Sequence, residues 1–152
     1  MKKKFLAAIL SVLCMVFSGL TSSAQQQQAG PGSPEEQEKK FNEYIQKEVD
    51  RLESVLKLED WQVFYVDSIL THDYHALQDE TKSLSAAKVT NSDIYTRVAD
   101  KWMENIYVAM NKVLDETQWA KYLKGGAMRE KKAREKRKAK LESTAAKLTE
   151  ND

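Results

Sequence analysis

Apolar residues recur at spacings of three and four along the middle of the chain, which is the spacing of one face of an α-helix. Between Glu35 and Lys124 there is neither a glycine nor a proline to interrupt a helix. The pattern predicts four helices, at about residues 34–56, 60–87, 94–113 and 116–124. No alternating strand pattern of useful length occurs in the sequence, so a sheet is not expected.

The apolar stripes of the three longer helices define the expected core. The stripes are Phe41, Tyr44, Ile45, Val49, Leu52, Val55 and Leu56; Val63, Val66, Leu70, Tyr74, Leu77 and Leu84; and Ile94, Val98, Trp102, Ile106, Ala109, Met110 and Val113. We expect an all-α fold in which the two central helices form an antiparallel hairpin, with the first and fourth helices beside it. One layer of helices buries limited apolar area, so we also expect a homodimer with coiled-coil-like contacts.

The first 24 residues have the features of a secretory signal peptide. Three lysines follow Met1, residues 5–17 are almost wholly apolar, and small side chains precede the expected cleavage point between Ala24 and Gln25. The alternative is an uncleaved anchor, but the apolar run is shorter than the roughly 20 residues that span a bilayer. Cleavage would remove Cys14, the sole cysteine. We therefore expect a periplasmic or secreted protein without thiol chemistry.

The rest of the chain divides into a linker, a helical domain and a tail. Residues 25–33 read QQQQAGPGS, a polar linker, and residues 34–124 form the predicted helical domain. Gly125-Gly126 is expected to end the fourth helix, which leaves residues 125–152 as a basic tail, either helical or frayed. Residues 25–120 hold 10 basic and 18 acidic residues, net −8, whereas the remainder holds 11 and 5, net +6. An acidic body therefore carries a basic tail.

One five-residue pattern occurs twice, as Leu58-Glu59-Asp60-Trp61-Gln62 and as Leu114-Asp115-Glu116-Thr117-Gln118. If the residue after each leucine is an N-cap, each glutamine stands three residues later and completes a capping box. Each leucine then precedes its cap, and the staple partners four residues beyond the caps are Val63 and Trp119. We interpret the two copies as two helix starts.

The two caps differ in quality. Asp115 is a preferred capping residue and Glu59 is not, so Asp60 is an alternative start for the second helix. Replacing Asp115 or Gln118 by alanine is expected to cost about 0.5–2 kcal/mol of stability, the usual cost of losing a cap.

Two such elements, 56 residues apart in an exported, helical chain, resemble the LTXXQ-motif family of Spy-like periplasmic chaperones. Leu58 with Gln62 and Leu114 with Gln118 match the ends of the motif, while Glu59 and Asp115 replace its threonine. The resemblance implies a curved helical homodimer that holds unfolded or stressed envelope proteins without ATP or catalysis. Some relatives sense envelope stress or metals. The motif residues are structural in the family, so no client-binding residue carries over.

Aromatic side chains exceed what one apolar stripe per helix requires, and Phe64 and Tyr107 lie off the predicted stripes. Core and dimer packing would use such residues. With Met103, Met110 and Met128 they could also form an adaptable apolar surface for varied clients.

The basic tail holds eight basic and two acidic residues between Arg129 and Lys140. Such a run is usually solvated. A functional role would need an anionic partner, namely lipid headgroups, an acidic client or the acidic body itself. The candidate partner surface comprises Trp61, Phe64, Met103, Tyr107, Arg134, Lys136, Arg137 and Lys138.

Other chemistry receives little support from the sequence. His72, His75 and Asp79 share a predicted helix face and are weak candidates for a metal site, so no cofactor is expected. There is no nucleophile elbow or phosphate-binding loop, which argues against an enzyme. No recognition motif for nucleic acid accompanies the basic tail. The alternatives to a chaperone-like protein are an adaptor with one defined envelope partner and a metal-responsive stress sensor.

Overall fold

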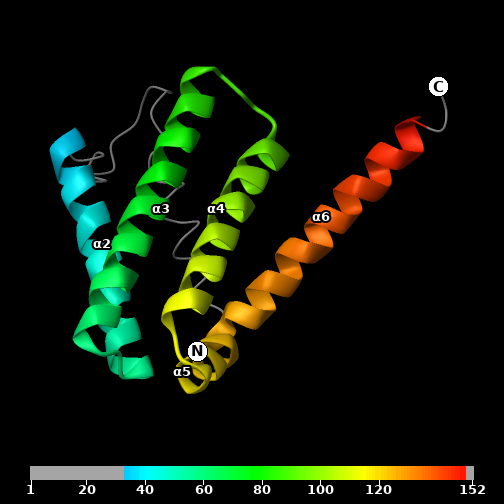
Figure 1. The fold of residues 1–152 in the computed structure, drawn as a ribbon. Helices are drawn as coiled ribbons and strands as arrows, with labels where there is room; N and C mark the ends of the chain where they lie inside the picture. Colours follow the sequence, from blue (N-terminus) through cyan, green and yellow to red (C-terminus); the bar gives the residue numbers. More distant parts are fainter. Residues whose placement is uncertain (1–32, 150–152) are drawn as a thin grey trace, which may run out of the picture. The chain divides into compact units, whose positions relative to one another are not determined.

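The computed structural model describes residues 33–149, so the expected signal peptide and nearly all of the linker lie outside the described residues. The described residues divide into two units, with the boundary between Asn42 and Glu43, inside the first described helix. The elements are α2 (Pro34–Leu56), α3 (Asp60–Ala86), α4 (Ser92–Val113), α5 (Glu116–Tyr122), the π-helical segment η1 (Leu123–Ala127) and α6 (Met128–Thr149) (Figure 1). No strand occurs in this part of the chain, which confirms the all-α class.

Side-chain caps begin two of the long helices. In the first unit, Ser33 and Glu36 form a reciprocal capping box, with N···O distances of 3.0 and 3.2 Å. Before α4, the side chain of Asn91 accepts a hydrogen bond from the backbone N–H of Asp93. Each cap satisfies a backbone N–H that has no partner within its helix.

Two lysines in the left-handed conformation end α2 and α3. Lys57 has φ 57° and Lys88 has φ 55°. The next residue donates its N–H back to the last turn in each case, from Leu58 to the Glu53 oxygen and from Val89 to the Leu84 oxygen. This is the Schellman arrangement, in which glycine is the usual residue at the left-handed position.

Lys88→Gly is therefore expected to raise the free energy of unfolding by about 0.5 kcal/mol. It removes the steric cost of a left-handed L-residue, and part of that gain is lost to the greater freedom of glycine in the unfolded chain. Urea denaturation measures the change. Lys82→Gly, inside α3, is the control and should instead lower stability by about 1 kcal/mol. A loss of stability in both variants would contradict this account.

The core of the second unit is formed by one face of each long helix. Its residues are Ile45, Val49, Leu52 and Leu56 from α2; Val66, Leu70, Tyr74 and Leu77 from α3; and Val98, Ile106 and Met110 from α4, with Leu114 after it. Apart from Leu114, all of these belong to the predicted stripes, and one stripe residue is clearly exposed. Val55 is 53% exposed, because it lies one position to the side of the Leu52–Leu56 line.

Helices α3 and α4 lie side by side and run in opposite directions, joined by a short turn (Figure 1). Near that turn, Oε2 of Glu80 on α3 accepts hydrogen bonds from Lys101 Nζ and Trp102 Nε1 of α4, at 2.8 and 2.7 Å. These bonds lower the pKa of the Glu80 carboxyl. None of the described helices is long and apolar enough to cross a bilayer.

The fourth helix ends before Gly125-Gly126, as expected, although two residues earlier than the predicted Lys124. Helix α5 ends at Tyr122, and the wider turn η1 connects it to α6. Gly126 has φ 136°, outside the helical range, and marks a kink that the bond from the Met128 N–H to the Leu123 oxygen spans. Glycine adopts this φ without steric cost, so the pair separates α5 from α6 at the kink.

Candidate partner-binding surface

The two copies of the repeated motif meet in space. The side-chain amides of Gln62 and Gln118 bond to each other reciprocally, with N···O distances of 2.6 and 2.8 Å. Both residues are buried, at 3% and 7% exposure. A buried amide is costly unless its donors and acceptor are satisfied, and this pairing satisfies both side chains at once.

The backbone around this glutamine pair repeats the same arrangement on both sides. Oε1 of each glutamine also accepts the N–H of its own cap residue, Glu59 or Asp115, at 3.0 Å. Nε2 of each donates to the carbonyl that precedes the other motif, from Gln62 to Val113 at 3.0 Å and from Gln118 to Lys57 at 3.4 Å. The start of α3 and the start of α5 are thus bonded directly to each other.

The structure confirms the helix-start interpretation and adds a tertiary role to it. Asp115 caps α5, with its Oδ1 accepting from the Gln118 N–H at 2.8 Å. Glu59, and not Asp60, is the N-cap of α3, and its Oε2 accepts from Trp61 Nε1 at 2.6 Å. The sequence shows that both glutamines can close capping boxes. It contains no signal that they bond to each other, since that depends on how α3 and α5 are placed.

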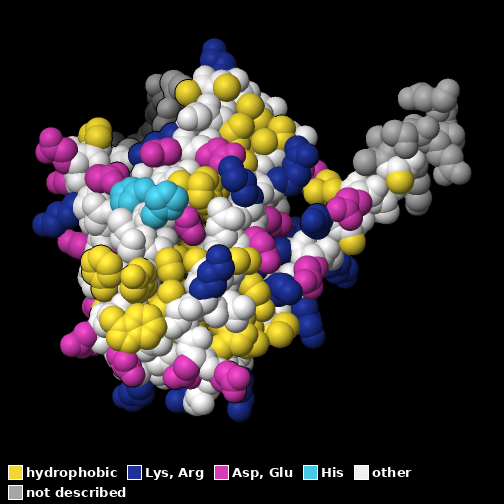
Figure 2. Space-filling model, viewed as in Figure 1, with side chains coloured by type: hydrophobic (Ala, Val, Ile, Leu, Met, Phe, Trp, Pro, Cys, Tyr) yellow, Lys and Arg dark blue, Asp and Glu magenta, His cyan; other side chains and the backbone are white. Residues whose placement is uncertain are grey.

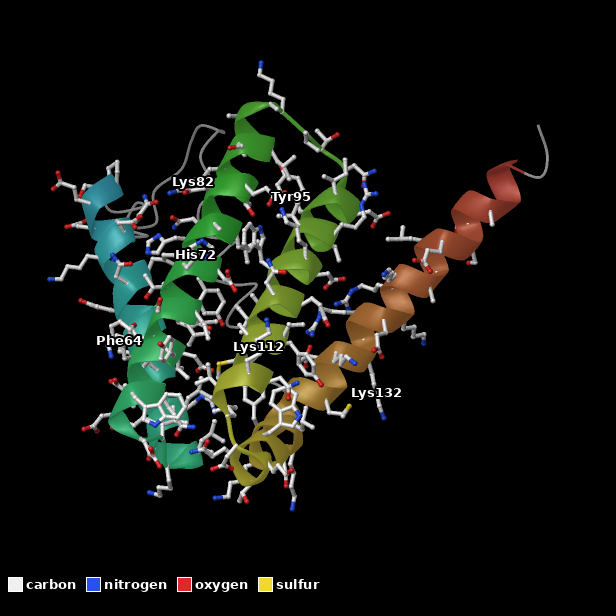
Figure 3. All side chains as sticks on the ribbon, in the orientation of Figure 1. Phe64, His72, Lys82, Tyr95, Lys112 and Lys132 are labelled. Carbon is white, nitrogen blue, oxygen red and sulfur yellow. The ribbon has the colours of Figure 1, made fainter. Side chains whose placement is uncertain are left out.

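Three adjacent aromatic side chains at the start of α3 are exposed to solvent: Trp61 at 52%, Phe64 at 69% and Tyr65 at 52%. We refer to them as the aromatic cluster. Their rings meet edge to face, with centroids 6.1 Å apart for Trp61–Tyr65 and 5.6 Å for Phe64–Tyr65. Figure 2 shows hydrophobic side chains gathered on this face, and Phe64 is labelled in Figure 3. Tyr65 is absent from the predicted surface residues, although its spacing from Trp61 places both on one helix face.

The other predicted apolar surface residues do not join this cluster. Tyr107 packs against Trp119, with ring centroids 4.9 Å apart, and Trp119 stacks on Tyr122 at 5.5 Å. Met103 is half-buried on α4. Met110 is fully buried, so its expected place on an exposed surface is wrong, because its helix turns it into the core.

Arg134 is not a free surface cation, contrary to the prediction. It is only 8% exposed, and its Nε and Nη2 donate to Glu104 Oε2 at 3.1 and 2.8 Å. The guanidinium carbon also lies 5.7 Å from the Tyr107 ring centroid. Arg137 binds both carboxylate oxygens of Asp100, and this raises the pKa of Arg137. The tail therefore forms ion pairs with the acidic body of its own chain. This is one of the three anionic partners that the sequence suggests for the tail.

The remaining two predicted cations, Lys136 and Lys138, are exposed on α6. Lys138 Nζ is 4.0 Å from Glu142 Oε1, a contact between two largely exposed groups that contributes little. The tail is helical as far as Thr149, and α6 diverges from α4 toward its C-terminal end (Figure 1).

Three tyrosines with raised pKa values lie along the interior of the second unit. Tyr44 and Tyr74 meet edge to face with ring centroids 6.2 Å apart. Burial, helped by the nearby carboxylate of Glu48, raises the pKa of Tyr44 and that of Tyr122 to about 12. Burial also raises the pKa of Tyr74. All three phenols remain protonated at neutral pH, so they pack as neutral groups and supply no base.

The histidines do not form the metal site for which the sequence makes them weak candidates. His72 is an exposed residue on α3, and its Nδ1 lies 2.8 Å from Oδ1 of the neighbouring Asp73 (Figure 3). Its ring also meets Trp102 of α4, with centroids 6.2 Å apart. Among the described residues, no three histidine, cysteine or acidic side chains are placed to share a metal ion, and this includes His72, His75 and Asp79.

An open hollow lies at the end of α2. It is lined by Asp50, Glu53, Ser54, Lys57 and Leu58. The hollow brings two carboxylates near one lysine, a mixture common on helix surfaces, and we assign it no binding role.

Comparison with protein-family models, curated proteins and solved structures found no match. The class that the structure defines is an all-α protein with an exposed aromatic cluster and an ion-paired basic helix.

Proposed function

We propose that this chain is an exported, homodimeric protein that binds other envelope proteins in a chaperone-like manner, without ATP. The resemblance to the Spy-like family suggests this function, and the aromatic cluster is the observation that supports it most. Trp61, Phe64 and Tyr65 are each more than half exposed to water. A group of large exposed rings is costly in a soluble protein unless another surface covers it at some stage.

The cluster is well suited to transient contact with unfolded chains. Aromatic rings bury a large area with few rotatable bonds, so little conformational entropy is lost on binding. Trp61 is also oriented by its hydrogen bond to Glu59, within the first turn of α3. That turn is anchored to α5 through the glutamine pair. The rings are therefore presented from a fixed helix start, while no pocket restricts which apolar segment they contact.

Suppression of client aggregation tests this function. The purified protein should keep several unrelated unfolded clients soluble at stoichiometric amounts without ATP. Replacing Trp61, Phe64 and Tyr65 together by serine should lower this activity at least fivefold, because the apolar contact area is lost. The matched control replaces Val55, Val108 and Leu141 by serine, which are not members of the cluster and are 53%, 46% and 40% exposed. It should retain the activity.

Circular dichroism and urea denaturation of both triple variants separate loss of binding from loss of folding. Protection of a single natural partner, but of no unrelated client, would favour the adaptor function instead. Equal loss of activity in both variants would show that general hydrophobicity, and not the cluster, is responsible. No suppression by the unmodified protein would rule out the chaperone-like function.

A further inference from the structure

Helix α6 has two sides with different electrostatic roles. The side toward α4 carries Arg134 and Arg137, which are paired with Glu104 and Asp100. A different side of the helix carries Lys132, Lys136 and Lys140, all exposed. We refer to these three as the lysine row. None of them forms an ion pair with a residue that the structure describes.

The lysine row is regular. Its members are four residues apart, so they follow one side of the helix over about 12 Å, at a rise of about 1.5 Å per residue. Like charges at this spacing destabilise an isolated helix. An acidic residue at Lys136 would relieve the repulsion, as Glu135 does for the neighbouring Lys131, at 3.0 Å. The three lysines therefore repel one another, and an anionic partner would neutralise this repulsion.

We propose that the lysine row docks α6 on an anionic membrane surface through lipid phosphate groups. A row on the outside of a helix fits a plane of charges, whereas a single small anion would need converging donors. The arginine pairs hold one side of α6 on α4, and the row, on a different side, stays exposed to solvent. Figure 3 shows Lys132 pointing away from α3 and α4. The contact is peripheral and electrostatic, because α6 has no continuous apolar face to insert.

This proposal does not depend on client binding by the aromatic cluster. The aromatic cluster is apolar and lies on α3, whereas the lysine row is charged and lies on α6. Loss of membrane binding would leave aggregation suppression intact, and the reverse also holds.

Cosedimentation with lipid vesicles tests the proposal. The purified chain is mixed at low salt with two kinds of vesicle. One is phosphatidylcholine alone, and the other is phosphatidylcholine with about one third phosphatidylglycerol. The chain should bind only the anionic vesicles and be released at about 0.5 M salt, where the Debye length falls below about 5 Å. Replacing all three row lysines by glutamine should lower the partition coefficient about 100-fold, since each lysine near an anionic surface contributes about fivefold.

The matched control replaces Lys47, Lys82 and Lys112 by glutamine, which changes the net charge equally from exposed positions on α2, α3 and α4. It should bind within about threefold of the unmodified chain, since its lysines lie on other helices than the docking row. Replacing the three row lysines by arginine instead of glutamine should leave binding to anionic vesicles close to that of the unmodified chain. Equal losses in the two glutamine variants, binding to neutral vesicles, or preferential binding of a soluble polyanion such as single-stranded DNA over the vesicles would each overturn the proposal.

Discussion

Gln118→Ala is expected to lower the free energy of unfolding by about 3 kcal/mol, a large part of the roughly 5–15 kcal/mol that holds a domain together. The substitution removes the Gln118 bonds to the Asp115 N–H and the Lys57 carbonyl. It also leaves the buried amide of Gln62 without its reciprocal partner. Unpaired buried polar groups cost about 1–3 kcal/mol each. The loss therefore exceeds the roughly 0.5–2 kcal/mol expected for a helix cap alone.

A double-mutant cycle with Gln62→Ala measures the coupling between the two residues by urea denaturation. The double variant should be less destabilised than the sum of the single variants by about 1 kcal/mol or more, because the second substitution removes an amide that the first has already left unpaired. Gln46→Ala, at an exposed glutamine of α2, is the control and should change stability by less than about 0.5 kcal/mol. Additive effects would show that the two glutamines act only as separate caps. Intact stability with loss of partner binding would show that the motif is a binding site.

Met110→Ala should destabilise the protein by about 3 kcal/mol. Met110 is 0% exposed on α4, so truncating it removes apolar contacts and leaves a cavity among the core residues of the second unit. Val108→Ala, two positions away and 46% exposed, is the matched control on the same helix and should change stability by less than about 0.5 kcal/mol. Thermal or urea unfolding of the two variants measures the difference.

The same pair of variants tests the division between core and partner surface. If Met110 contributed to client binding, Met110→Ala would lower aggregation suppression without changing stability. We expect the reverse, in which folded Met110→Ala protein suppresses aggregation normally at a temperature where it remains folded. Loss of suppression by folded Met110→Ala would place the client surface on α4 and not at the aromatic cluster.

Much of the local structure depends on residues close together in the chain. Asp115 begins α5 where its type and position predict, because a cap bonds to an N–H only two or three residues away, and Asn91 caps α4 in the same way. The exposure of Phe64 is also predictable, since it lies off the apolar stripe of its helix. The role of Gly126 is not predictable from the sequence. A glycine at positive φ can either end a helix or bend it, and the packing of the next segment decides between the two.

The candidate surfaces are less predictable. Trp61 and Phe64 are exposed as expected, whereas Tyr107 is half-buried against α5 and α6 and Arg134 is buried against α4. A composition rich in cations predicts a basic tail, but it cannot show which cations face the acidic body. Only the bend at η1 turns α6 so that Arg134 and Arg137 meet Glu104 and Asp100 while Lys132 and Lys136 face outward.

The sequence by itself determined the all-α class, the helix starts and most of the buried stripe, because these depend on spacing and on bonds within a few residues. The signal peptide and the homodimer remain predictions from that same sequence. The tertiary structure alone decided that the two repeated glutamines, 56 residues apart, bond to each other. It also decided that Tyr107 packs against Trp119 and which basic side chains stay in water. Those outcomes depend on how helices pack, and long-range packing brings together residues whose spacing in the chain contains no periodic signal.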